Sequence, residues 1–158
     1  MTPDRQMLRH TLATLAYRAE KALRAAPDGF CEFRASPTSR TPGQILAHMC
    51  DLMDWALWLA RGKHVWHDTQ PTMWSDDCAR FFAAAEAFDA YLASDEPLGW
   101  SVERLFQAPI ADALTHTGQI NMLRRLAGGP VRGENYAKAE IAAGRVGADQ
   151  SAKRVEFD

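Results

Sequence analysis

The sequence predicts an all-α protein, a four-helix bundle with a short extra helix near its C-terminal end. Apolar residues recur at three- and four-residue spacing in four segments, as on one face of an amphipathic helix. No segment alternates polar and apolar residues over a length typical of a sheet. Glycine and proline fall mostly between the periodic segments, where they mark turns. These observations favour helices packed around one apolar core.

The composition is that of an ordinary globular domain. The chain has 158 residues, 47% hydrophobic and 24% charged, which suffices for one domain with its own core. The net charge of −2 indicates no basic surface, so nucleic acid is not expected as a partner. No apolar run has the length of a signal peptide or a membrane span, so no membrane partner is expected either. Three widely spaced cysteines favour a reducing cytoplasm over a disulfide framework.

The first helix is predicted over residues 4–26. Its apolar face consists of Leu8, Leu12, Leu15, Ala19 and Leu23. Pro27 and Gly29 oppose continuation and end the helix. The loop that follows carries Phe30 and Phe33, which we expect to pack against the bundle.

The second helix begins with a recognisable start signal. Thr41 can cap it, Pro42 suits its first position, and Gln44 stands where a capping box has its second member. The helix then runs to Gly62. Its apolar face consists of Ile45, Met49, Leu52, Met53, Ala56, Leu59 and Ala60. His48 lies inside that stripe rather than opposite it.

Two further helices are predicted after a long connection. The third covers residues 75–94, with Ser75 as its cap and acidic residues in its first turn. The fourth covers residues 109–127, because Pro109 restarts or kinks the chain and two glycines end the periodic segment. Residues 134–143 could form the short extra helix.

The chain divides into two parts on this prediction. Residues 1–128 form the bundle. Residues 129–158 form a C-terminal extension that packs either on the bundle or on a second subunit. The end of the extension has no helical periodicity and is expected to be irregular.

Three polar residues lie on or beside the apolar stripes. Asp112 and His116 are four residues apart on the fourth helix, so their side chains can reach one point, and His48 joins them if the second and fourth helices face each other. Imidazole and carboxylate are ligands of zinc and other divalent metals, and three protein ligands leave positions open for water or substrate. The plainer interpretation is a surface pair worth about 0.3–0.5 kcal/mol and a hydrogen-bonded core histidine.

Two stretches carry a resemblance to a known family. The segment "TPGQILAHMCDLMDWALWLARG", followed later by "DALTHTGQINMLRRLAGG", is similar to the DinB/YfiT-like superfamily of bacterial four-helix-bundle metalloenzymes, over residues 5–128. That family has one ligand histidine in the second helix and two more, four residues apart, in the fourth, often followed by a glutamine. His48, His116 and Gln119 match these places, and Asp112 stands where the family has a histidine.

The resemblance implies one divalent metal ion (zinc, nickel, iron or manganese), in some relatives a low-molecular-weight thiol, and a homodimer. The carboxylate of Asp112 keeps a three-residue site and makes it harder and more anionic. Its shorter side chain can bind the metal directly, bind through water, or orient a neighbour.

The function implied by the resemblance is that of an enzyme, which the cysteine content and the lack of a signal segment would place in the cytoplasm. A metal would activate water or a thiol toward a small molecule, in a hydrolase or a thiol S-transferase, because coordination lowers the pKa of the bound group. The alternative is a non-catalytic helical bundle, with the metal absent or structural, that acts through dimerisation or partner binding. In that case His48, Asp112 and His116 form a hydrogen-bonded core network.

Four further residues have two interpretations each. Arg124 and Arg125 could bind an anionic substrate, or could be solvated charges that interact favourably with the C-terminal end of the helix dipole. Trp55 or Trp74 could form a pocket wall, or belong with the other tryptophans to the core or a subunit interface.

Overall fold

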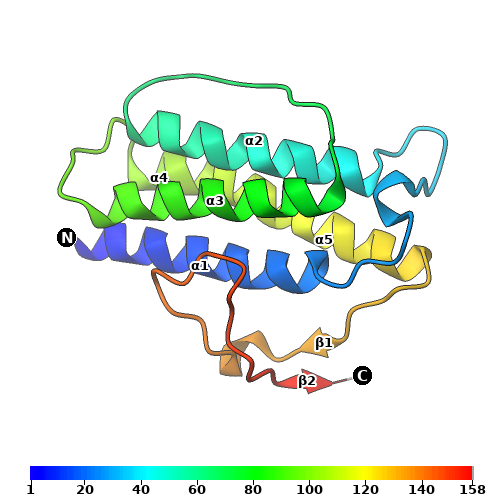
Figure 1. Cartoon of the computed structure of the whole chain (residues 1–158). Coiled ribbons are helices and arrows are strands. Elements are labelled where there is room, and N and C mark those ends of the chain that lie inside the picture. Colours follow the sequence, from blue (N-terminus) through cyan, green and yellow to red (C-terminus); the bar gives the residue numbers. More distant parts are fainter. Residues whose placement is uncertain (158) are drawn as a thin grey trace.

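In a computed structural model that describes residues 1–157, four long helices pack side by side as the predicted all-α bundle (Figure 1). They are α1 (Pro3–Leu23), α2 (Pro42–Ala60), α3 (Trp74–Ala93) and α5 (Ala111–Leu126). A short helix, α4 (Val102–Leu105), leads into α5 through a π-helical turn, η2 (Phe106–Ile110). The predicted all-α fold class is confirmed, and each of the four long predicted helices starts and ends within a few residues of an observed one.

The start of α2 is the predicted capping box. The Thr41 hydroxyl accepts a hydrogen bond from the Gln44 backbone N–H at 3.2 Å, and Gln44 Oε1 accepts one from the Thr41 N–H at 2.9 Å. Because both backbone donors are satisfied, the first turn of α2 is held firmly. Arg40 is thereby placed directly before the cap, and His48 in the second turn of the helix.

The start of α3 differs from the prediction. Ser75 is not the cap: the helix begins at Trp74, and its N-cap Met73 makes no side-chain capping bond. The carboxylate of Asp77 instead reaches back and accepts hydrogen bonds from the N–H and the hydroxyl of Thr72, each at 2.8 Å. A carboxylate in the first helical turn serves the same purpose, because negative charge is favoured there.

Pro109 does not interrupt the chain but lies inside the π-helical turn η2. Proline has no N–H and clashes with the preceding turn of an α-helix, so a locally wider turn accommodates it. Ile110 is buried in the core at the end of this turn. The turn therefore sets the direction in which the side chain of Asp112, in the first turn of α5, projects from the helix.

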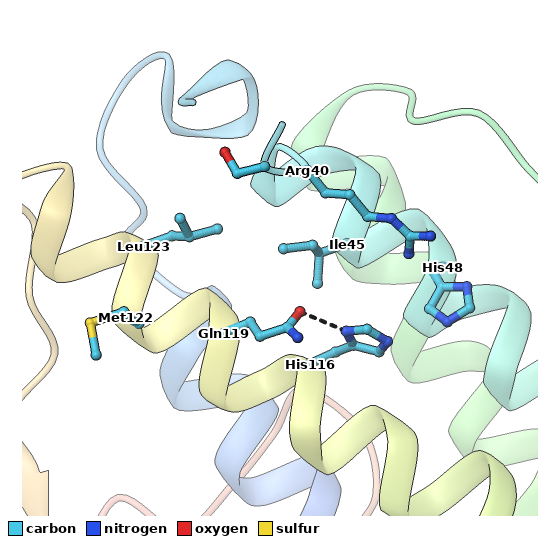
Figure 2. A pocket seen from close by; sticks show the side chains of 8 residues that line it. Arg40, Ile45, His48, His116, Gln119, Met122 and Leu123 are labelled. Atoms are coloured by element: carbon cyan, nitrogen blue, oxygen red, sulfur yellow. Dashed lines mark hydrogen bonds between the residues drawn. The ribbon is translucent and has the colours of Figure 1, made fainter. Parts of the chain in front are cut away.

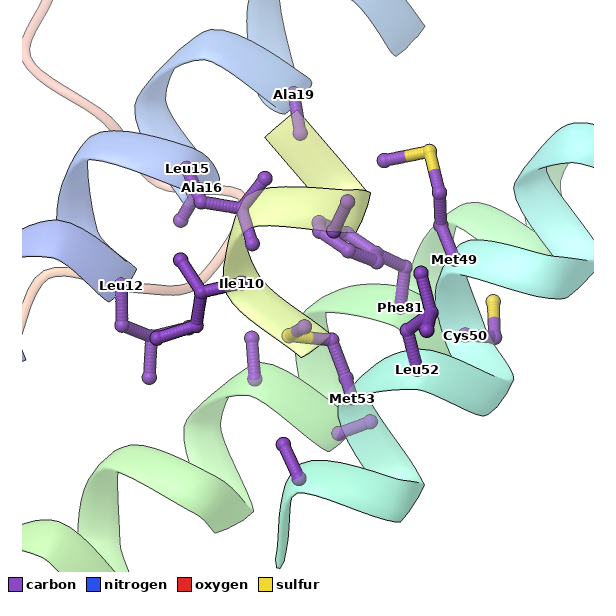
Figure 3. Packing of buried hydrophobic residues seen from close by; sticks show 14 of the residues in the cluster. Leu12, Leu15, Ala16, Ala19, Met49, Cys50, Leu52, Met53, Phe81 and Ile110 are labelled. Atoms are coloured by element: carbon purple, nitrogen blue, oxygen red, sulfur yellow. The ribbon is translucent and has the colours of Figure 1, made fainter. Parts of the chain in front are cut away.

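Buried side chains from all four long helices meet in one apolar core (Figure 3). Fully buried members include Leu12, Leu15, Met49, Met53, Phe81 and Ile110. Burial of each such side chain contributes roughly 1.5–3 kcal/mol to folding. Phe30 is buried and Phe33 packs against the core, as predicted. Within the described residues, each helix is too short or too polar to traverse a bilayer.

The segment after the bundle corrects the prediction of an extra helix. Within residues 134–143 only a 3₁₀ turn forms, η3 (Tyr136–Lys138), because so short a segment needs an apolar face packed on the core to sustain a helix. Instead β1 (Gly133–Glu134) pairs antiparallel with β2 (Glu156–Phe157) in a two-stranded sheet. The extension lies along α1 of its own chain (Figure 1).

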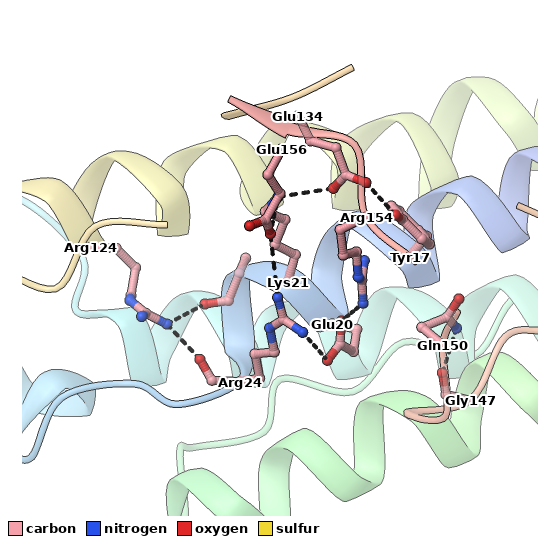
Figure 4. Close-up of polar contacts among 11 residues, drawn as sticks. Tyr17, Glu20, Lys21, Arg24, Arg124, Glu134, Gly147, Gln150, Arg154 and Glu156 are labelled. Carbon is pink, nitrogen blue, oxygen red and sulfur yellow. Dashed lines mark hydrogen bonds and ion pairs between the residues drawn. The ribbon is translucent and has the colours of Figure 1, made fainter. Parts of the chain in front are cut away.

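Buried ionic groups join this extension to α1 (Figure 4). Lys21 is 2% exposed, and its Nζ lies 2.9 Å from a carboxylate oxygen of Glu134 and 3.0 Å from one of Glu156. The Tyr17 hydroxyl donates a further hydrogen bond to Glu134. Burial raises the pKa of Glu134, but the hydrogen bonds from Tyr17 and Lys21 and the charge of Lys21 outweigh it and hold that pKa below its ordinary value.

Candidate metal centre

The facing sides of α2 and α5 carry the three residues predicted as metal ligands. His48 projects from α2, and Asp112 and His116 project from successive turns of α5. Their side chains are 23%, 46% and 12% exposed, respectively. The structure therefore brings the three together at the edge of the core, and His48 is less buried than its place in the apolar stripe predicts.

The carboxylate of Asp112 lies between the two imidazoles. Its Oδ2 is 3.3 Å from Nε2 of His48 and 3.5 Å from Nε2 of His116. The two rings are perpendicular, with centroids 4.8 Å apart. Across residues 1–157, these three form the one group of His, Cys, Asp or Glu side chains whose ligand atoms lie close enough together, within 4.8 Å, to hold a metal ion.

A hydrogen bond on the far side of the ring orients His116 (Figure 2). Its Nδ1 lies 2.8 Å from Oε1 of Gln119, about one turn further along α5. Since an amide oxygen only accepts, Nδ1 donates this hydrogen bond, and in the neutral tautomer with its proton on Nδ1 the lone pair of Nε2 is directed toward Asp112. Two electron-rich atoms 3.5 Å apart repel each other unless a cation lies between them. The arrangement fits a shared cation, either a metal ion or the proton of an imidazolium.

The two ligand-atom separations from Asp112 also fit a divalent metal. Bonds of about 2.0–2.1 Å to tetrahedral zinc place neighbouring ligand atoms about 3.3–3.4 Å apart. The separations from Asp112 Oδ2 to the two histidine nitrogens, 3.3 and 3.5 Å, are close to this value. Two imidazoles and one carboxylate also suit iron, nickel or manganese. His48, Asp112 and His116 are thus the residues that could hold a metal ion, and its identity is not determined by their chemistry.

A cavity of about 670 Å³ opens beside the two histidines (Figure 2). Its walls come from the start of α2, the residues just before it, and α5. The lining residues are Ser39, Arg40, Ile45, His48, His116, Gln119, Met122 and Leu123. A smaller cavity of about 170 Å³ shares Arg40 and His48 with the first and is otherwise lined by Gln44, Asp68, Thr69, Gln70 and Pro71. His48 and His116 therefore face a space that a small molecule can enter.

The loop between α2 and α3 adds an aromatic contact to His48. Trp66 lies edge-on to His48, with ring centroids 5.5 Å apart, and edge-on to Trp55 at 5.7 Å. The carboxylate of Asp51 holds the loop by accepting hydrogen bonds from the N–H and the hydroxyl of Thr69, each at 2.7 Å. The sequence does not reveal Trp66 as a neighbour of His48, since helical periodicity says nothing about the path of a loop.

Two residues with open interpretations have structural roles. Trp74 packs edge-on against Phe30, with centroids 5.4 Å apart, and does not line the cavity beside His48. Arg124 is 5% exposed, and its guanidinium donates hydrogen bonds to backbone carbonyls around the end of α1 (Figure 4). The accepting carbonyls are those of Ala22, Arg24, Ala25 and Gly129. Arg124 therefore stabilises the C-terminal end of a helix dipole and is not directed at a substrate.

Neither Cys50 nor Cys78 lines the two cavities at His48. Burial raises the pKa of both thiols, that of Cys78 to about 12. Both thiols are protonated at neutral pH and are weak nucleophiles. Neither Cys50 nor Cys78 is therefore a source of thiolate at this centre.

Comparisons with protein-family models, with curated proteins and with solved structures find no match to this chain. The resemblance to the DinB/YfiT-like superfamily stays a prediction from its two motifs. The class that the structure itself defines is a helical bundle with a three-residue group able to hold a metal ion.

Proposed function

We propose that this protein is a divalent-metal-dependent enzyme of DinB/YfiT-like type, which acts on a small molecule as a hydrolase or a thiol S-transferase. The observation that carries the proposal is the convergence of His48, Asp112 and His116 from two helices beside a cavity of about 670 Å³. A divalent ion there would lower the pKa of a bound water or thiol and so make hydroxide or thiolate available at neutral pH.

The residues of the chain have separable roles in this proposal. Asp112 brings the negative charge that offsets the cation, and the two histidines bring neutral nitrogen donors. Gln119 keeps the proton of His116 on Nδ1 and so leaves Nε2 free to coordinate. Trp66 packs against His48 and limits its rotation.

Metal analysis of the full chain, purified without chelator, tests the proposal. We expect about one divalent ion per chain, as for a single site whose ligands are held by the fold. His48→Ala and His116→Ala should each abolish most of this content. His10→Ala is the matched control, because His10 is an exposed histidine of α1 far along the chain from the site. Absence of bound metal, together with no uptake of zinc, nickel, iron or manganese, would overturn the proposal.

The two reaction types are separated by their co-substrate. A hydrolase turns over an activated ester, such as p-nitrophenyl acetate, with the metal alone. A thiol S-transferase consumes an electrophile, such as 1-chloro-2,4-dinitrobenzene, only when a small thiol is added. In both cases His116→Ala should remove the activity, because the activating metal would be lost.

A second candidate is a non-catalytic bundle that acts through dimerisation or partner binding. It is favoured by the 3.3 Å contact between His48 Nε2 and Asp112 Oδ2, which can be a hydrogen bond without any metal. Met122 and Leu126, four residues apart on α5 and more than half exposed, would offer apolar area to a second copy. Sedimentation before and after chelation discriminates: a dimer with no metal and no turnover supports this candidate.

A further inference from the structure

We propose that the larger cavity binds an amphiphilic carboxylate, with the carboxylate on Arg40 and the apolar part of the molecule against Ile45, Met122 and Leu123. The inference rests on the proposed function in one respect: it takes this cavity as the substrate site of the metal centre. It names the chemical class of the substrate, which the metal ligands alone do not.

The charge distribution in the cavity favours an anion. Among the described residues that line it, Arg40 carries the only formal charge, and none is acidic. Within residues 1–157, the exposed guanidinium of Arg40 has no ion pair or hydrogen bond, so its charge is available. Asp68 lines the smaller cavity, not the larger one, so its carboxylate does not face an anion bound in the larger cavity.

The surroundings of Arg40 reinforce this preference. Arg40 directly precedes Thr41, the N-cap of α2, where the positive end of the helix dipole lies. In Figure 2 its side chain extends along α2 toward the His48 end of the cavity. A planar guanidinium binds a planar carboxylate through two parallel N–H···O bonds, which orients the ligand as well as attracting it.

The remaining walls favour a hydrocarbon. Ile45 of α2 is 3% exposed and Leu123 of α5 is 8% exposed, so both belong to the core and present only an edge to the cavity. Met122, 58% exposed, forms an adaptable apolar lip on α5. Cavities of about 300–1,000 Å³ hold small organic ligands, and this one, at about 670 Å³, lies inside that range.

The arrangement also gives the ligand a direction relative to the metal centre. Arg40 and His48 line the same cavity, and His116 lines it from the facing helix. A molecule held by its carboxylate on Arg40 therefore keeps its neighbouring carbon atoms beside the two histidines. Arg40 would act as a binding residue that selects and orients the substrate, with no part in activating the nucleophile.

The test measures the binding of octanoate and of 1-octanol, its uncharged counterpart, to the full chain after chelator treatment. Methyl resonances of Ile45, Met122 and Leu123 report the site. We expect octanoate to shift these resonances and to bind about tenfold more tightly than 1-octanol, as one charge-assisted bidentate pair warrants. Arg40→Gln should remove that preference and leave 1-octanol binding unchanged. Arg125→Gln, the same charge change at another exposed arginine that lines neither cavity at His48, should have no effect.

Three outcomes would overturn the inference. The first two are equal binding of octanoate and 1-octanol by the unaltered protein, and no shift of the methyl resonances of the three reporter residues. The third is an equal loss of the preference for octanoate in Arg40→Gln and Arg125→Gln. Since binding is measured without metal, its failure is independent of metal content and leaves the proposed function standing. Conversely, selective octanoate binding by a protein that takes up no metal would establish the ligand class and overturn the enzymatic proposal.

Discussion

His48 and Asp112 are 64 residues apart in the chain, and Nε2 of the first lies 3.3 Å from Oδ2 of the second. This contact joins α2 to α5. The same oxygen lies 3.5 Å from Nε2 of His116, so the Asp112 carboxylate is the centre of the three-residue group. Asp112 is therefore the residue whose substitution says most about the site.

Asp112→Asn should weaken zinc binding by more than about tenfold, because an amide is a poorer donor and brings no negative charge. Competition with a chromophoric chelator measures the affinity. Asp112→His, which supplies a nitrogen donor at this position, should bind zinc more tightly than Asp112→Asn. Asp76→Asn, at an exposed carboxylate in the first turn of α3, serves as the control. Unchanged affinity in Asp112→Asn would show that Asp112 is not a ligand.

Gln119→Ala should lower zinc affinity by about 10–100-fold, since loss of the partner of Nδ1 frees the His116 ring to rotate and to change tautomer. Gln119→Glu keeps an acceptor at that atom and should recover most of the affinity. The control is Gln6→Ala, at an exposed glutamine of α1. Equal affinities for Gln119→Ala and Gln119→Glu would mean that the hydrogen bond does not support the site.

Glu134→Gln should lower the free energy of unfolding by about 3 kcal/mol, because it removes one partner of a buried ion pair and leaves the ammonium of Lys21 undercompensated. The side chains of Lys21 and Glu134 are 2% and 0% exposed. Guanidinium denaturation measures the change. Glu140→Gln removes a carboxylate from the exposed pair with Lys153, and its free energy of unfolding should stay close to that of the unaltered protein. A small effect of Glu134→Gln would show that the buried pair of Lys21 and Glu134 adds little to stability.

Tyr17 makes the stability of the protein depend on alkaline pH. Burial, and then the hydrogen bond to Glu134, raise the pKa of Tyr17 from 10.0 to about 12. Since the folded state holds this proton more tightly, the contribution is complete below pH 10 and is lost as the pH rises toward about 12. The free energy of unfolding should therefore fall over that range. In Tyr17→Phe, which lacks the titrating hydroxyl, the free energy of unfolding should fall less steeply. Parallel curves for the two proteins would contradict the assignment.

Much of the fold follows from local signals. The apolar stripes of residues 4–26 and 109–127 predict α1 and α5, and the capping box at Thr41 predicts the start of α2, because periodicity and caps act over a few residues. The predicted start of α3 was wrong by one residue. The carboxylate of Asp77, rather than the predicted cap Ser75, accepts hydrogen bonds before the first turn. The predicted helix over residues 134–143 was wrong: only the 3₁₀ turn η3 forms there, and Glu134 at its start belongs to β1, which pairs with β2.

Part of the candidate site could also be predicted from local sequence signals. The four-residue spacing of Asp112 and His116 places both on one side of a helix, and the position of His48 in an apolar stripe directs it toward the bundle. Trp66 and Arg40 were not found, because each belongs to a connection whose path depends on distant partners. For the loop that carries Trp66, one such partner is Asp51, which binds Thr69.

The sequence by itself determined four amphipathic helices and three polar side chains able to coordinate a metal, since both follow from residue type and spacing along one helix at a time. The tertiary structure decided that α2 and α5 face each other with His48 level with Asp112, and that a cavity with Arg40 at one end opens beside them. It also decided that the C-terminal extension closes over α1 through Lys21 and Glu134. These features depend on the packing of segments far apart in the chain, which no local pattern encodes.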